Sequence, residues 1–165
     1  KMETSEALEN LLWMIVLVII PIFTWIYWNV KTKRYTNMDV SDRKQRNSLY
    51  VFNTIVVCNY IAFLYFNKES FDLILIIIFT LTLMIVMHIS NFFIKSSMHT
   101  SFNIFVSALF FNLNIYFGMV WLILTVMVGI SRVILKRHTV KEVIMGASIA
   151  TVISFLYLYL NIQNH

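Results

Sequence analysis

The stretch FDLILIIIFTLTLMIVMHISNFFI, residues Phe71–Ile94, decides the fold. It contains no Lys, Arg or Glu, and its one acidic residue, Asp72, lies at the border. A helix needs about 20 mostly apolar residues to cross the hydrocarbon core of a bilayer. The stretch meets that requirement, so it predicts a transmembrane helix.

The rest of the chain has the same character. Of its 165 residues, 59% are hydrophobic and 13% are charged, whereas a soluble domain has about 45–50% apolar and about 25% charged residues. The three glycines and single proline, together with the absence of apolar–polar alternation, argue against a barrel. We therefore expect one all-α integral membrane domain covering residues 1–165.

Six apolar segments are long enough to be membrane spans. They are roughly residues 11–30, 49–66, 71–94, 101–117, 118–135 and 143–160. Because successive helices alternate in direction, the polar segments after the first, third and fifth spans share one side of the membrane. These segments are Lys31–Ser48, Lys95–Thr100 and Lys136–Glu142, and they hold nearly all the basic residues. The positive-inside rule assigns that side to the cytoplasm.

Chemically useful residues gather in the third of these segments. His138 and Glu142 are four residues apart, so on a helix they share one face. A carboxylate bonded to one imidazole nitrogen fixes the tautomer and raises the basicity of the other nitrogen, as in an activated histidine nucleophile or base. Arg132 lies at the membrane edge, where an ionised group is costly without a partner. An anionic ligand would be a suitable partner.

The second segment brings another histidine to the same side. It reads Lys95-Ser96-Ser97-Met98-His99-Thr100 and directly precedes the fourth predicted span. Hydroxyls and backbone N–H groups at a helix start favour an anion. Taken without Arg132, the His138–Glu142 pair has a plainer interpretation as an interfacial helix pair, and His99 as a loop histidine.

These motifs resemble those of the type 2 phosphatidic acid phosphatases, membrane relatives of the vanadium haloperoxidases. The family's third signature is Ser-Arg, five residues, His, three residues, Asp, and it matches Ser131 to Glu142. Its second, Pro-Ser-Gly-His, falls on Ser96–His99. Its first, Lys, six residues, Arg-Pro, falls partly on Asp39–Asn47. The three signatures precede spans six, four and two, and the resemblance covers all six spans.

The sequence departs from the family pattern at five positions. Glu142 stands for Asp, which keeps the charge and adds a methylene. The other departures are Ser96 for Pro, Met98 for Gly, Asp39 for Lys and Asn47 for Pro. A glycine at the Met98 position would let the backbone approach a phosphate closely. The third signature is the most specific, and the first is the weakest.

The resemblance implies two-step hydrolysis of a phosphate ester. His138 would attack phosphorus and form a phosphohistidine, while Glu142 would orient its ring. His99 would protonate the leaving oxygen and then activate water. Arg132, Arg46 and the Ser97 hydroxyl would hold the phosphoryl oxygens.

Other charged residues have open roles. Arg43, Lys44 or Lys33 would supply the charge missing at Asp39, although Arg43 and Lys44 also suit lipid headgroups. We expect no cofactor, no metal and no nucleic-acid partner, because the charge lies beside the spans.

Several alternatives stay open. The substrate would be a lipid phosphate such as phosphatidate, phosphatidylglycerophosphate, an undecaprenyl phosphate or a lipid A phosphate. A catalytically degenerate relative that binds anionic lipid, or serves as a partner subunit, is the alternative function. We expect a bacterial cytoplasmic membrane. The side of the site is open, because bacterial members of the family commonly act on the outer face, and so is the oligomeric state.

Overall fold

The computed structural model describes residues 4–40 and 42–163, and every regular element in them is helical. Five helices are long and apolar enough to cross a membrane, judged by length and composition. They are Ser5–Lys31, Arg43–Phe66, Phe71–Asn91, Ile115–Ile134 and Val140–Gln163. The expectation of a helical membrane protein is therefore confirmed. The chain forms two compact units, residues 1–77 and 78–165, which we describe in turn.

The segment 101–117 is not among these five helices, so the sixth span stays a prediction. This segment belongs to helix α5, Met98–Leu113, which has 16 residues. At 1.5 Å per residue it extends about 24 Å, short of the roughly 30 Å hydrocarbon core. The cause is Asn114, whose backbone is extended (φ −160°, ψ 129°) and whose side chain accepts a hydrogen bond from the Tyr116 N–H. An asparagine in this role ends one helix and caps the next.

The first unit opens with one nearly continuous helix. It consists of α1 (Thr4–Met14), the π-helical segment η1 (Ile15–Ile19) and α2 (Ile20–Lys31). Pro21 lies in the first turn of α2. A proline cannot donate a helical hydrogen bond, and its ring crowds the preceding turn. The widened π turn ahead of Pro21 is consistent with that crowding.

Helix α3 (Arg43–Phe66) packs on this first helix. The Trp25 and Phe52 rings stack with centroids 4.3 Å apart. The Tyr35 hydroxyl links Trp25 Nε1 (3.1 Å) to Ser48 Oγ (2.7 Å). Asp42 caps α3 by accepting hydrogen bonds from two backbone N–H groups of its first turn. The polar segment before α3 is thus folded against the helix rather than extended.

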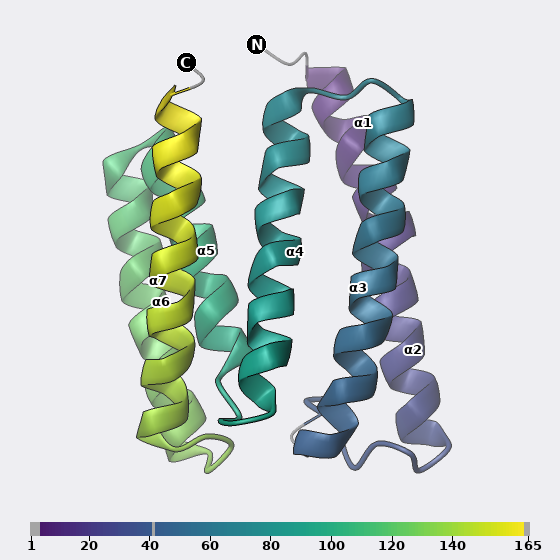
Figure 1. Ribbon diagram of the computed structural model, residues 1–165, viewed down its shortest axis with the longest axis vertical. Helices are drawn as coiled ribbons and strands as arrows, with labels where there is room; N and C mark the ends of the chain where they lie inside the picture. Colours follow the sequence, from purple (N-terminus) through teal and green to yellow (C-terminus); the bar gives the residue numbers. More distant parts are fainter. Residues whose placement is uncertain (1–3, 41, 164–165) are drawn as a thin grey trace. The chain divides into compact units, whose positions relative to one another are not determined.

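The second unit contains the end of α4 (Phe71–Asn91), α5, α6 (Ile115–Ile134) and α7 (Val140–Gln163). Successive helices run in opposite directions, so the α4–α5 and α6–α7 connections lie at the same end of this unit (Figure 1). The predicted alternation thus holds within the second unit. It brings the Lys95–Thr100 and Lys136–Glu142 segments to one end.

Helix α5 packs on both α6 and α7. Two of its buried serines donate hydroxyl hydrogen bonds to carbonyls of the neighbouring helices, Ser107 to Gly118 O (3.0 Å) and Ser101 to Gly146 O (2.8 Å). Small polar residues of this kind allow close approach and interhelical hydrogen bonds between membrane helices. The Tyr157 ring of α7 meets Phe79 and Phe105 edge-on, each at 5.6 Å.

Candidate active site

The turn between α6 and α7 begins with a Schellman motif. The Arg137 N–H donates to Arg132 O, and the Lys136 N–H donates to Val133 O, each at 3.0 Å. Lys136 has a φ of 54°, the left-handed conformation that this motif places just after the helix. The His138 N–H also donates to Arg132 O, at 3.2 Å. The motif therefore fixes the backbone of His138 against the last turn of α6.

Lys136→Gly is expected to stabilise the protein by about 0.5–1 kcal/mol. The left-handed conformation costs a residue with a Cβ about 1–2 kcal/mol, and the extra freedom of glycine in the unfolded chain offsets part of the gain. Thermal unfolding in detergent measures the change. Lys141→Gly, at an exposed position in the first turn of α7, is the matched control and should be destabilising. Equal losses in both variants would contradict the strain at Lys136.

Helix α7 begins with a capping box. The Thr139 hydroxyl accepts from the Glu142 N–H at 3.3 Å, and Glu142 Oε2 accepts from the Thr139 N–H at 2.9 Å. This reciprocal pair satisfies two N–H groups that a helix start would otherwise leave unbonded. It also holds the Glu142 carboxylate in one orientation, beside the residue that precedes the cap.

That residue is His138. Its Nδ1 lies 3.1 Å from Glu142 Oε2, the same oxygen that closes the capping box. The His138 side chain is 2% exposed and that of Glu142 is 19% exposed, so solvent screens their interaction only partly. A carboxylate at Nδ1 favours the proton on that nitrogen, so Nε2 carries the lone pair. This arrangement suits a nucleophile or general base.

Glu142→Gln separates the electrostatic role of Glu142 from its capping role. Glutamine keeps an amide oxygen for the capping box but loses the charge that raises the basicity of His138. For the phosphate-ester hydrolysis that the family resemblance implies, we expect turnover to fall by about 10²-fold or more with little change in melting temperature. Glu142→Ala should also lose about 1 kcal/mol of stability with the cap. If the glutamine variant turned over substrate at the wild-type rate, Glu142 would have a capping role only.

The start of α5 is bonded to the start of α7. The Ser97 N–H donates to Glu142 O at 3.0 Å. The Ser97 side chain caps α5, accepting from Thr100 N (3.4 Å) and Thr100 Oγ1 (3.0 Å), and the residue is fully buried. Lys95 Nζ donates to Arg137 O at 3.0 Å. These hydrogen bonds join the second polar segment, Lys95–Thr100, to the third, Lys136–Glu142.

A glycine makes this contact possible. A Cβ on Gly146 would lie 2.8 Å from Ser97 O and 2.8 Å from Ser101 Oγ. Ser101 itself donates to both Gly146 O (2.8 Å) and Ser97 O (2.9 Å). The two helices touch backbone to backbone here, one turn beyond Glu142.

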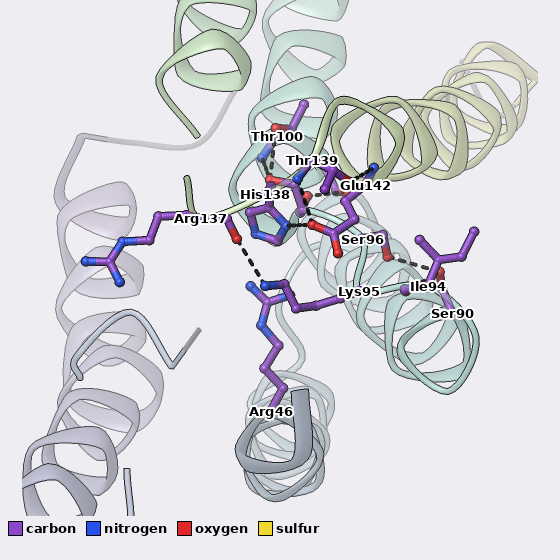
Figure 2. Close-up of polar contacts among 12 residues, drawn as sticks. Arg46, Ser90, Ile94, Lys95, Ser96, Thr100, Arg137, His138, Thr139 and Glu142 are labelled. Atoms are coloured by element: carbon purple, nitrogen blue, oxygen red, sulfur yellow. Dashed lines mark hydrogen bonds and ion pairs between the residues drawn. The ribbon is translucent and has the colours of Figure 1, made fainter. Parts of the chain in front are cut away.

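A pocket of about 320 Å³ opens beside His138. Three cationic residues, Lys95, Lys136 and Arg137, line it together with His138 and Glu142. Figure 2 shows the His138 ring turned toward Glu142 and the Lys95 side chain reaching toward the Arg137 carbonyl. The excess of positive charge over the single carboxylate favours an anionic ligand.

The structure brings together part of the predicted site. His138 and Glu142 are directly bonded. Arg132 supplies the carbonyl that holds the His138 backbone, and its side chain is half-buried. The Ser97 hydroxyl accepts two hydrogen bonds from Thr100 as a helix cap, and its part in phosphate binding stays a prediction. His99 lies exposed in the first turn of α5, and its role also stays a prediction.

The remaining candidates belong to the first unit. Arg46 is 2% exposed and donates from Nε to Val40 O at 3.1 Å. Val40 has a φ of 45°, an uncommon conformation for a β-branched residue. Arg43 and Lys44 are exposed in the first turn of α3. Phosphate binding by these three basic residues stays a prediction.

Five residues that line the pocket were not among the predicted site residues: Lys95, Val133, Lys136, Arg137 and Thr139. Thr139 carries a readable signal, because Thr, two residues, Glu before an apolar run is the pattern of a capping box. Lys95 carries no such sequence signal, because a lysine at the end of a span is readily interpreted as an interfacial anchor. Only the fold of the α4–α5 connection brings it to Arg137.

Across residues 4–40 and 42–163, no group of three or more His, Cys, Asp or Glu residues is arranged to hold a metal ion. No protein-family model matches the chain, and neither a curated protein nor a solved structure is significantly similar to it. The fold and site therefore define the class directly. The protein is a helical membrane protein in which a buried histidine is bonded to a partly exposed carboxylate beside a cationic pocket.

Proposed function

We propose that the protein is a lipid phosphate phosphatase that works through a phosphohistidine at His138. The observation that carries the proposal is the 3.1 Å contact between His138 Nδ1 and Glu142. The capping box holds Glu142 in place, and cationic residues line the adjacent pocket. The location of this pair in a membrane protein favours a substrate delivered within the bilayer.

In the first step, the Nε2 lone pair of His138 attacks phosphorus and the bond from phosphorus to the ester oxygen breaks. Glu142 stabilises the imidazolium character that develops on the ring. The leaving oxygen takes a proton from His99, which lies in the first turn of α5, two residues after the Ser97 that bonds to Glu142 O. A loose phosphoryl transition state spreads charge over its equatorial oxygens.

In the second step, His99 removes a proton from water, and the water oxygen attacks the phosphohistidine. The P–N bond breaks, its electron pair returns to Nε2, and inorganic phosphate leaves. Preorganised positive groups lower both barriers. We assign this task to Arg132 and Lys95, both in the second unit. Arginine suits it because its planar fork binds two oxygens at once.

We also propose that α5 completes a bundle of six crossings. It runs antiparallel to α6, and Asn114 alone separates the two helices. A short helix can cross where the bilayer thins locally. The candidate site would then lie at one membrane surface, where a lipid headgroup is found.

The test is release of inorganic phosphate by purified protein from a panel of lipid phosphates and diphosphates in detergent. We expect turnover of at least one lipid phosphate without added metal. Binding of lipid phosphates with no release from any of them would favour the alternative, a non-catalytic protein that binds anionic lipid. If the protein neither binds lipid phosphates nor releases phosphate from them, the phosphatase and the lipid-binding alternative are both refuted.

A further inference from the structure

A second, apolar groove lies between α5, α6 and α7. Its volume is about 400 Å³, and its walls are almost entirely aliphatic. The two hydroxyl-bearing residues in its wall use their hydroxyls elsewhere, since Thr100 donates to Ser97 Oγ and Thr125 donates to Trp121 O. The groove therefore presents hydrocarbon to whatever fills it.

The groove adjoins the His138 pocket. Val133 lines both. On α7, Thr139 and Glu142 face the pocket while Val140 and Val143 face the groove. The cationic pocket and the aliphatic groove thus lie next to each other and share the wall formed by Val133.

Small residues keep the groove hollow. A Cβ on Gly129 would lie 3.2 Å from Val143 Cγ1 and 3.8 Å from Thr100 Oγ1, so a larger side chain there would enter the groove. Ala147, one turn after Val143, also lines it. Replacing Gly129 or Ala147 by a larger residue would therefore reduce the volume of the groove.

We propose that this groove binds the hydrocarbon chain of the lipid whose phosphate occupies the His138 pocket. This inference rests on the proposed function and narrows its substrate. Because Val133 belongs to both cavities, the chain has to begin close to the phosphate. The ligand is thus a phosphate ester of a single long-chain alcohol, in preference to one with a glycerol or sugar spacer.

The groove acts by shape rather than by hydrophobicity. A lipid chain in the bilayer is already in hydrocarbon, so moving it onto the protein gains packing contacts and little else. The positive charges of Lys95, Lys136 and Arg137 hold the phosphate. They therefore select a lipid chain that carries a phosphate over other lipid chains. Chain length and the phosphate are therefore both required for occupancy.

The first test is photo-crosslinking, which needs no turnover. Hexadecyl phosphate with a diazirine on its chain is irradiated with the full-length protein in detergent. We expect labelling in α6 and α7 at groove residues, and competition by hexadecyl phosphate but not by hexadecanol. Labelling spread over the lipid-facing residues of all helices, or equal competition by the alcohol, would overturn the proposal.

A matched pair of variants completes the test. Ala147→Leu fills the groove, whereas Ser148→Leu adds the same side chain at the next, exposed position of α7. We expect Ala147→Leu to lower specific labelling about tenfold and Ser148→Leu to leave it unchanged. Equal effects in the two variants would refute the groove.

Activity gives an independent readout that cancels differences in folded fraction. The ratio of kcat/KM for hexadecyl phosphate to that for butyl phosphate should fall about tenfold in Ala147→Leu. An unchanged ratio counts against the groove and leaves the phosphatase assignment standing. Groove labelling by a protein that releases no phosphate has the opposite meaning, since it refutes the phosphatase and supports the groove.

Discussion

His138→Ala is expected to lower phosphate release from lipid phosphates by at least about 10⁴-fold. The variant removes the proposed nucleophile, and the loss of a covalent nucleophile leaves only positioning and electrostatic stabilisation to act on the substrate. The Glu142 carboxylate stays in the capping box, because Thr139 N–H holds it independently at 2.9 Å. The effect is therefore on chemistry more than on helix structure.

His138→Asn sharpens this prediction. An asparagine amide reaches about as far as Nδ1, so it can keep a hydrogen bond to Glu142, but it has no atom at the Nε2 position. We expect the asparagine variant to be as inactive as the alanine variant and to melt closer to the wild type. His88→Asn is the control in the same unit, because His88 of α4 stacks on Phe92, just beyond the helix, and does not line the pocket.

The intermediate can be trapped directly. Brief reaction with ³²P-labelled substrate followed by denaturation in base should leave acid-labile label on wild-type protein and none on either His138 variant. Glu142→Gln should accumulate less label during the same interval, because it weakens the attack. Full activity in His138→Ala would refute the phosphohistidine mechanism outright.

Much of the helical framework follows from apolar run length. The segment 71–94 is a helix in the structure from Phe71 to Asn91, because bilayer-length apolar runs have no other way to satisfy their backbone. The boundary at Asn114 was harder to place. Residues 115–117 are apolar and extend the preceding run, so hydropathy assigns them to the wrong helix, while the asparagine cap decides the break.

The local part of the site was also readable from the sequence. His138 and Glu142 are four residues apart, and one turn of helix start is enough to join them. Contacts between segments were not readable in this way. The bond from Ser97 N–H to Glu142 O depends on how closely α5 approaches α7. That distance is set by side-chain volume at a packing contact, which hydropathy and spacing do not report.

Gly146→Ala is expected to destabilise the protein by about 1–3 kcal/mol. Inside a helix, alanine normally gains about 0.5–1 kcal/mol over glycine, so the sign of the effect is itself diagnostic. A Cβ at residue 146 would lie 2.8 Å from Ser97 O, a backbone atom that cannot rotate away. Thermal unfolding in detergent, followed by tryptophan fluorescence, measures the loss.

Gly129→Ala is the matched control, because its closest contact would be the end of the Val143 side chain at 3.2 Å. That side chain can shift, so we expect a change near zero or a small gain. Ser101→Ala combined with Gly146→Ala should recover only part of the loss, since it removes the clash with Ser101 Oγ but keeps the one with Ser97 O. A Gly146→Ala variant that melts at or above the wild type would contradict the close approach of α5 and α7. Loss of turnover per folded molecule in that variant would in turn show that the approach aligns Glu142, because Ser97 and Glu142 share a backbone bond.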